Sequence, residues 1–529
     1  MAPVEGVRAD FGGPAAFLRR LAPRLAGQDG GVVEFVERGV ARHTRSIDRL
    51  DLAGDDKGGG LGLPARHAAH AGHRLDEINV LVVDLVEQRL LLRRNIHADH
   101  EQVLCCDGHA VALLPLFSRP GILQYGGVAS ARRTAMDSLV QTPVTTSAED
   151  RARALQPLLD AHGAEMDRRR ELTPQVVEAL FERDMLRLLL PRGLGGQEIH
   201  LLDYCKACEQ LAWADASVAW FVNQSNVSSA TSAAAMSREA AMTAFGGARE
   251  GLAWGSRHNM SKAIRVEGGY RLTGTWSFAS GGRHTNYLGA HSAVQNPDGT
   301  PHMRHGRPDD RSFVFKRSDA KITDDWYVLG LRGTGSDTYT VTDLFIPDGW
   351  APAREALEER QVTGPLYTIM STLLYATGFC AVTLGVGRRM LETYIELARG
   401  KQSRAATSIM AKNDAIQREI ANLEAKLSAA RAFLHEAVVA TYDAAASGTL
   451  NLDHRMRLRL ATTWGMNAAS DVSIASYRAA GTTAILDANP FERRFRDAMS
   501  ASQHLQALPP HLEMVGRHLL GTENKVQHL

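Results

Sequence analysis

The sequence predicts an α+β multidomain protein in which a helical segment, a small β domain and a second helical segment follow one another. Apolar residues recur at helical spacing between residues 150 and 250, alternate in short runs separated by turn residues from 251, and return to helical spacing after 352. We therefore expect four parts. They are an extension over residues 1–135, an N-terminal helical domain over 136–250, a middle β domain over 251–352 and a C-terminal helical bundle over 353–529.

The size and charge of the chain exclude several classes of function. It has 529 residues, 44% of them hydrophobic, and 60 Lys plus Arg against 59 Asp plus Glu leave a formal net charge of +1. Such a chain buries a large core but has no global field that draws nucleic acid or an anionic membrane. Five cysteines, no signal-peptide pattern and no apolar run long enough to span a bilayer predict a cytoplasmic protein without nucleic-acid or membrane partners.

Residues 1–135 differ in composition from the rest of the chain. All seven tryptophans lie beyond this segment, and Lys57 is its single lysine among many arginines. Because Met136 is followed by a polar leader and a helical pattern, we interpret the segment as a poorly ordered extension or as the product of a wrong start assignment. The alternative is a small helical appendage built on the apolar run Ile78–Leu92.

Three sets of metal-type or redox-type side chains occur at spacings that do not fit a site. They are His67, His70 and His73, the adjacent pair Cys105 and Cys106, and the pair Cys205 and Cys208. On a helix the first and third histidines point about 120° apart, the adjacent cysteines form no C-x-x-C knuckle, and the last pair lies inside a helical pattern. We predict no metal site, and neither a dinucleotide-binding G-x-G-x-x-G nor a P-loop pattern is present.

Cap and turn residues mark the elements of the first two domains. Thr173 and Pro174 form an N-cap and first-turn pair, Pro191–Gly196 interrupts the helical pattern, and Asp215 opens a later helix. Beyond Gly251 the alternating runs are bounded by Gly-Gly, Asn-Pro-Asp-Gly and Asp-Asp turns. The expected strands include Ala263–Glu267, Tyr270–Thr275, Ser312–Lys316 and Tyr339–Ile346.

The last domain carries the strongest helical signal. Its apolar residues are spaced alternately four and three apart, as in a packing seam within a bundle or between subunits. The seam consists of Ile416, Ile420, Leu423, Leu427, Ala430 and Leu434.

Six segments follow the order found in the acyl-CoA dehydrogenase superfamily, which the chain resembles over roughly residues 150–521. They are PRGLGGQE, DASVAW, GYRLTGTWSFASG, GLRGTGSDTYTVTDLFIP, AKNDAIQREIANLEAKLSAARAFL, and NPFERRFRDAMSASQH with GRHLLG behind it. The resemblance implies an N-terminal helical domain, a β-barrel-like middle domain and a C-terminal four-helix bundle. It also implies a flavin between the β domain and the C-terminal helices, and assembly as a homotetramer.

The segment after Arg496 and Asp497 departs from the dehydrogenase pattern. The family's catalytic glutamate stands in a Tyr-Glu-Gly-Thr motif, whose first two positions correspond here to His504 and Leu505. Leucine cannot take a proton, whereas a histidine at the first position resembles the flavin-dependent monooxygenases of this fold, including the oxygenase component of p-hydroxyphenylacetate hydroxylase. An imidazole with a pKa near ~6.5 can hydrogen-bond a flavin hydroperoxide or accept a phenolic proton, so the resemblance implies a catalytic role for His504.

The resemblance also implies flavin contacts in TGTWSFASG. Phe278 falls at the family's flavin-stacking tryptophan, Ser280 at the threonine that bonds flavin N5, and Trp276 becomes a third wall. An aromatic face and a hydroxyl are suited to these tasks. Without the resemblance, all three are ordinary alternating strand residues.

A second flavin element and a substrate pocket follow from the same comparison. Arg332, Thr334 and Ser336 correspond to the family's Arg-x-Ser-x-Thr element, which meets the flavin phosphate or supports the ring; a solvated turn is the alternative. Asn223 and Ser225 are candidates for a polar substrate pocket, and the alternative is that they bond the backbone of their own helix.

The leading hypothesis is the oxygenase component of a two-component flavin-dependent monooxygenase. It would take reduced FMN or FAD from a separate NAD(P)H:flavin reductase and, with molecular oxygen, hydroxylate an aromatic or polycyclic small molecule through a C4a-hydroperoxyflavin, with His504 and Ser280 as catalytic residues. N-oxygenation or sulfur oxidation stays open within this class. The alternatives are an FAD-dependent acyl-CoA dehydrogenase with a relocated base and a tetrameric scaffold that has lost its flavin.

Overall fold

The computed structural model describes residues 105–106, 109–110, 146–258, 261–353, 355–404 and 406–522. The chain divides into two compact units, Met1–Thr134 and Ala135–Leu529. In the first unit, strands β1 (Cys105–Cys106) and β2 (His109–Ala110) pair in antiparallel fashion. The helix expected around Ile78–Leu92 and the histidines His67, His70 and His73 lie outside the described residues.

The second unit begins, in its described part, with a helical domain of five helices, all but α5 capped at the N-terminus by a side chain. These helices are α4 (Ala148–Arg169), α5 (Pro174–Glu182), α6 (Leu201–Ala214), α7 (Ala216–Ala233) and α8 (Arg238–Phe245). Asp215 caps α7 by accepting a hydrogen bond from the Val218 amide at 3.0 Å, as its residue type predicts. Thr173 occupies the N-cap position of α5, but its hydroxyl contacts His162 Nδ1 at 3.1 Å instead of capping the helix.

The middle domain is an eight-stranded, curled sheet. Its main strands are β5 (Lys262–Val266), β6 (Gly269–Ser277), β7 (Tyr287–Gln295), β10 (Asp310–Lys316), β11 (Lys321–Thr323) and β12 (Thr338–Pro347), in the order β10-β7-β5-β6-β12-β11. Two short strands, β3 (Leu252–Trp254) and β4 (Ser256–Arg257), pair with β7 and β6. A β-bulge between Val341 and Leu344 shifts the register of β12 against β6.

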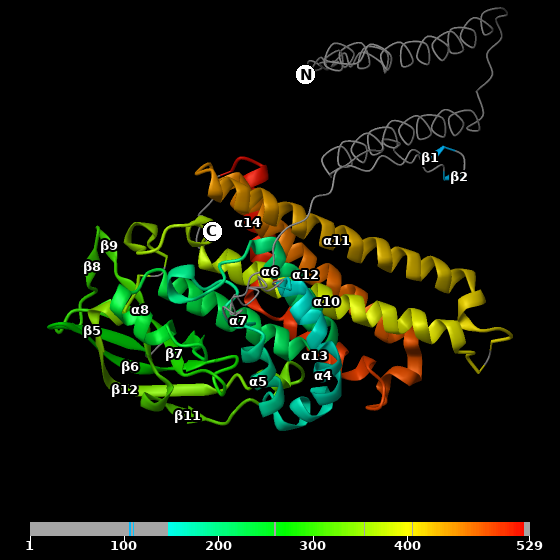
Figure 1. Ribbon diagram of the computed structural model, residues 1–529, viewed down its shortest axis with the longest axis horizontal. Coiled ribbons are helices and arrows are strands. Elements are labelled where there is room, and N and C mark those ends of the chain that lie inside the picture. The colour runs from blue at the N-terminus through cyan, green and yellow to red at the C-terminus, as the bar shows by residue number, and fades with distance from the viewer. Residues whose placement is uncertain are drawn as a thin grey trace, which may run out of the picture. The chain divides into compact units, whose positions relative to one another are not determined.

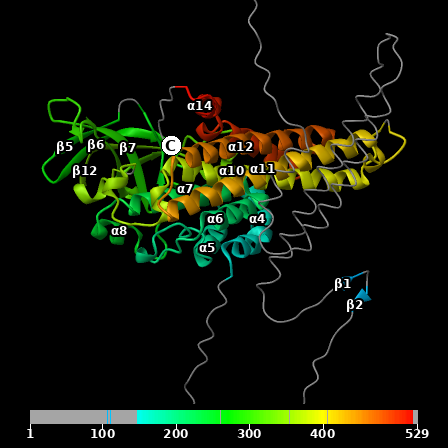
Figure 2. The ribbon, with the colours of Figure 1, turned by 90° about the horizontal axis from the view of Figure 1, so that it is seen from above.

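The C-terminal domain is a helical bundle dominated by three long helices that lie side by side in Figures 1 and 2. They are α10 (Ser371–Gly400), α11 (Asp414–Ala446) and α12 (Leu452–Ala480). The short helix α9 (Pro365–Thr368) precedes them, and α13 (Phe491–Ser502) and α14 (Pro509–Leu519) complete the bundle. Leu427, Ala430 and Leu434 of the predicted seam are fully buried, so this part of the seam packs within the chain.

One continuous apolar core joins the N-terminal helices to the C-terminal bundle, while the sheet has a core of its own. The loops that leave the sheet therefore meet a rigid helical body, which is where the candidate site lies. Among the described residues, no helix has both the length and the apolarity that crossing a membrane requires.

Candidate active site

Five rings from four parts of the fold form an aromatic cage. The Trp220 ring on α7 lies 4.0 Å from Phe379 on α10, and both rings contact the imidazole of His504, at centroid distances of 5.2 and 4.4 Å. Tyr375 stacks on Phe379 at 6.1 Å and lies equally far from Trp254 of β3. Flat apolar faces of this kind are suited to stacking on a planar ligand.

His504 follows α13 and is the N-cap of a short 3₁₀ turn, η8 (Leu505–Ala507). The Gln506 amide donates a hydrogen bond to His504 Nδ1 at 3.3 Å, so the proton of the neutral ring sits on Nε2. Burial, together with a smaller effect of the nearby His511, lowers the pKa of His504 to about 4. At neutral pH the ring is uncharged and offers an N–H donor to the cage.

Three hydroxyls form a buried cluster at the edge of the sheet. Ser336 Oγ lies 2.8 Å from Ser280 Oγ and 2.6 Å from Thr334 Oγ1. The loops are also joined by their backbones, because the Gly281 amide donates to the Thr334 carbonyl oxygen at 2.8 Å. The structure thus brings Ser280 together with Thr334 and Ser336, which lie more than fifty residues further along the chain.

Phe278 stands beside this cluster in an unusual conformation. Its backbone is left-handed, with φ of +64°, and its side chain is 60% exposed although it is a large apolar residue. Trp326 contacts the ring edge-on at 5.7 Å. An exposed aromatic face beside hydroxyls that can donate or accept fits a flat, polar-edged ring system such as a flavin, so these residues are suited to hold one.

Two other residues assigned to the flavin are engaged elsewhere. Trp276 is fully buried, stacks on Tyr339 at 5.7 Å and donates from Nε1 to the His291 carbonyl oxygen. The guanidinium of Arg332 donates from Nε to the Asp167 carbonyl oxygen at 3.1 Å and fixes the end of α4. Trp276 therefore belongs to the core of the sheet, and Arg332 joins the β domain to the helices.

The two residues predicted for a polar substrate pocket are both buried in α7. Asn223 accepts from the Tyr204 hydroxyl at 2.9 Å and donates to the Tyr375 carbonyl oxygen, so its amide is satisfied between helices. The Ser225 hydroxyl has no hydrogen-bond partner among the described residues and faces the β domain at Gly251. The structure does not bring Asn223 and Ser225 together on one wall.

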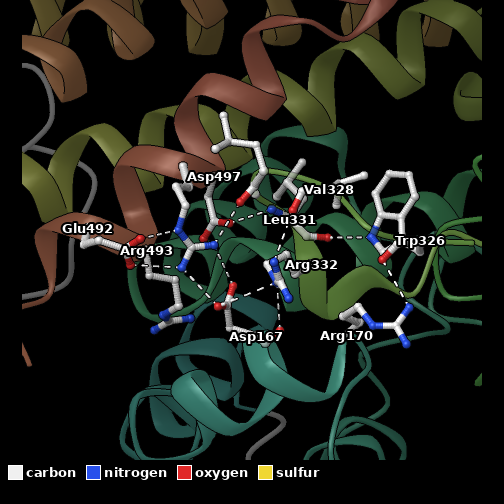
Figure 3. A network of polar contacts seen from close by, with 12 residues as sticks. Asp167, Arg170, Trp326, Val328, Leu331, Arg332, Glu492, Arg493 and Asp497 are labelled. Carbon is white, nitrogen blue, oxygen red and sulfur yellow. Dashed lines mark hydrogen bonds and ion pairs between the residues drawn. The ribbon is translucent and has the colours of Figure 1, made fainter. Parts of the chain in front are cut away.

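A polar network attaches the loop that carries the hydroxyl cluster to α13 (Figure 3). The Leu331 amide donates to Asp497 Oδ1 at 2.6 Å, and the Gly330 amide donates to Ser500 Oγ at 2.9 Å. Arg496, one residue before Asp497, reaches across to both carboxylate oxygens of Asp167 at 3.0 Å. The helix that leads into His504 therefore also fixes the position of the flavin-side loop.

Asp497 gives this network a pH-dependent contribution to stability. Burial raises the pKa of its carboxyl to about 7, against the opposing effects of Arg493 and the Leu331 amide. Because the folded pKa lies above the unfolded value, the protonated Asp497 carboxyl favours the folded state fully below about pH 4, and this contribution is lost as the pH rises towards 7.

The free energy of unfolding of the native protein is therefore expected to fall by about 2–3 kcal/mol between pH 5 and 8 on account of Asp497, and in Asp497→Asn this fall should be absent. The measurement is a urea titration of both proteins at each pH. An equal slope in both proteins would contradict this assignment.

The sequence analysis missed the four other rings of the cage. Trp220, Tyr375 and Phe379 occur in apolar helices and Trp254 in a buried strand, where each also suits an ordinary core. The signal that could have identified two of them is their position in the sequence, since Trp220 precedes and Trp254 follows the predicted substrate residues Asn223 and Ser225. Only the folded chain shows that these rings form one cluster, in which Trp220 and Phe379 contact His504.

The buried cysteines have no redox geometry. Cys205, Cys208 and Cys380 are free thiols, and burial raises the pKa of Cys208 to about 12. Among the described residues, no three His, Cys, Asp or Glu side chains are grouped as metal ligands. These thiols therefore pack as small apolar groups.

Known proteins are similar to this chain in both of its helical domains and in its fold. The family model "Acyl-CoA dehydrogenase, N-terminal domain" matches residues 148–241, and "Acyl-CoA dehydrogenase, C-terminal domain" matches residues 377–509. Indole-3-acetate monooxygenase of Pseudomonas putida is 28% identical over 375 residues, covering 70% of this chain and 94% of the relative. The p-hydroxyphenylacetate 3-hydroxylase oxygenase component of Acinetobacter baumannii is 26% identical, covering 72% and 92%. The structure of XiaF from Streptomyces in complex with FADH2 and glycerol is 23% identical with a TM-score of 0.68, covering 73% and 98%.

Proposed function

The chain belongs to the acyl-CoA dehydrogenase superfamily, and from this premise we propose that it is the oxygenase component of a two-component flavin-dependent monooxygenase acting on an aromatic small molecule. Similarity to two oxygenases over more than nine-tenths of their length supports the reaction class. The aromatic cage around His504 supports the substrate class, because planar rings stack favourably on such walls.

One observation carries the choice of oxygenase over dehydrogenase. Neither α7 nor the first part of α10, from Ser371 to Leu391, contains an aspartate or glutamate, and Leu505 stands where the family's base is expected. Removing a proton next to a thioester needs a carboxylate base within reach. A neutral imidazole among aromatic rings cannot replace that carboxylate but can donate a hydrogen bond to oxygen.

We assign different roles to the flavin-side residues and to His504. Phe278 would cover the flavin ring, and Ser280, held by Ser336 and Thr334, would contact its polar edge. Reduced flavin, when bound, supplies the two electrons with which dioxygen gives one oxygen atom to the substrate and one to water. His504 donates from Nε2 to an oxygen atom in the cage, which stabilises charge that develops there. The apolar rings exclude water, so the oxygen atom goes to the substrate instead of forming hydrogen peroxide.

The proposal implies partners that the chain does not contain. No nicotinamide-binding fingerprint occurs in the sequence, so we place the supply of reduced FMN or FAD with a separate NAD(P)H:flavin reductase. We further propose a cytoplasmic homotetramer, as the family resemblance implies. Exposed Trp464 on α12 supports a contact between copies of the bundle.

The test follows the oxygen atom. The protein is mixed with chemically reduced FMN or FAD and ¹⁸O₂ in the presence of phenols, indoles and polycyclic aromatics, and products are analysed by mass spectrometry. We expect one ¹⁸O atom in the product for each flavin oxidised. Reduction of an artificial electron acceptor by acyl-CoA, without labelled product from any aromatic compound, would instead establish a dehydrogenase. A protein that binds no flavin would indicate a scaffold.

A further inference from the structure

A stripe of polar side chains on one face of α12 contacts the turn that follows His504. Arg459, Thr463 and Asn467 are spaced four residues apart, so they lie one above another on the helix. Arg459 donates from Nη1 to the side-chain oxygen of Gln506, and Thr463 Oγ1 donates to the Gln506 carbonyl oxygen at 2.9 Å. Asn467 Nδ2 donates to the Ala507 carbonyl oxygen at 2.9 Å. We refer to Arg459, Thr463 and Asn467 as the α12 stripe.

Arg459 is an unusual residue at this position. Its side chain is only 1% exposed, burial lowers its pKa to about 10, and within the described parts of the chain no carboxylate pairs with it. A buried guanidinium without a counter-ion is unfavourable, and an apolar side chain would pack this helix at less cost. Its single hydrogen-bond partner among the described residues is Gln506, which is itself 4% exposed. The hydrogen bond from Arg459 to Gln506 therefore fixes the position of the turn and contributes less to the packing of the bundle.

The 3₁₀ turn η8 also fixes the imidazole of His504. The Gln506 amide donates to His504 Nδ1 at 3.3 Å, and the Ala507 amide donates to the His504 carbonyl oxygen at 2.8 Å. Because Nδ1 is an acceptor, the ring proton lies on Nε2, at the opposite edge of the ring, and no described residue is bonded to that atom. A shift of the turn would release Nδ1 and allow the other tautomer.

We propose that the α12 stripe is the positioning element of His504. Arg459 and Thr463 hold Gln506 from its side chain and its carbonyl, and the Gln506 amide holds the imidazole in the Nε2–H tautomer against Trp220 and Phe379. Arg459 is thus a positioning residue: it acts through Gln506 and would contact neither the flavin nor the aromatic substrate. The role of this tautomer in oxygen transfer rests on the proposed function, whereas the tautomer itself does not.

The test compares Arg459→Met, which keeps an unbranched apolar stem but removes the guanidinium, with Gln506→Leu, the double variant and the nearly isosteric Thr463→Val. Arg457→Met is the matched control, because Arg457 lies two residues earlier on α12, is half exposed and pairs with Glu436. The His504 tautomer is measured from imidazole ¹⁵N shifts in histidine-labelled protein, with His504→Asn used to assign the signal. Product and hydrogen peroxide per flavin oxidised, and the Kd for reduced flavin, are measured alongside.

Arg459→Met and Thr463→Val are expected to convert the single Nε2–H signal into a tautomer mixture and to lower the ratio of product to peroxide about tenfold. The flavin Kd should change less than about twofold, since the stripe does not contact the flavin-side loops. In the Gln506→Leu background, Arg459→Met should add little, because both act on one path.

Two results would overturn the proposal. One is an unchanged tautomer in folded Arg459→Met, or in Thr463→Val if the arginine variant does not fold. The other is an equal loss in Arg457→Met. If the native protein oxygenates no aromatic compound, the proposed function fails, but the tautomer comparison still decides the role of the α12 stripe.

Discussion

His504→Ala is expected to lower the ratio of hydroxylated product to hydrogen peroxide about 100-fold, because it removes the Nε2 donor that stabilises the reacting oxygen. Flavin binding should be nearly unchanged, since Phe278 and the hydroxyl cluster lie on the loops of the sheet and not on η8. The measurement is the yield of product and of peroxide for each reduced flavin consumed, together with a flavin titration.

His504→Asn separates the two tasks of this residue. An asparagine oxygen can still accept from the Gln506 amide and cap the 3₁₀ turn, but it presents no donor at the position of Nε2. We expect Asn to uncouple the reaction as strongly as Ala while retaining more stability. Full coupling in His504→Asn would assign the oxygen contact to another group.

In the native protein the product yield should be constant from about pH 5.5 to 8, because the pKa of His504 lies near 4 and the neutral ring prevails throughout.

Arg493→Met is expected to destabilise the fold by roughly 3–5 kcal/mol, the range observed when one partner of a buried ion pair is removed. Arg493 on α13 donates to Asp215, which is only 3% exposed and also caps α7. Its guanidinium packs directly over Gly163 of α4, where only a glycine leaves room for it. Removing the cation leaves the carboxylates of Asp215 and Asp497 buried together at the point where the helices meet.

The measurement is the urea midpoint of Arg493→Met against that of Arg399→Met. Arg399 pairs with Glu396 on the surface of α10, and both side chains are more than two-thirds exposed, so its loss should change little. Because Asp215 begins the helix that carries Trp220, we also expect Arg493→Met to weaken the binding of aromatic compounds. Equal midpoints for the two variants would show that the buried pair contributes nothing beyond a surface pair.

The architecture followed from the sequence because its periodicities are local. The strands expected at Tyr270–Thr275 and Tyr339–Ile346 lie within β6 and β12, and the helix expected to begin at Asp215 is α7. Caps, turn residues and alternation act over a few residues, so a linear pattern reports them. The order of six family segments then indicated how the three domains assemble.

The candidate site was predicted only where the family pattern names a position. His504, Phe278 and the hydroxyls of Ser280, Thr334 and Ser336 were singled out in this way, and their roles stay predictions. Trp276 and Arg332 came from the same alignment and their flavin roles also stay predictions; the structure places Trp276 in the core of the sheet and joins Arg332 to α4. A strand alternates its faces, so matching residue types does not establish which side chain reaches the ligand.

The sequence by itself determined the succession of helical, β and helical domains, the absence of a carboxylate base at Leu505 and the histidine beside it. Tertiary structure alone decided that Trp220 and Phe379 contact that histidine, that Tyr375 and Trp254 extend the same aromatic cluster, and that the α12 stripe holds its turn. The reason is physical: a propensity or a cap is fixed by neighbours along the chain, whereas a ring contact, a tautomer or a buried pKa depends on groups that come together only when distant segments pack.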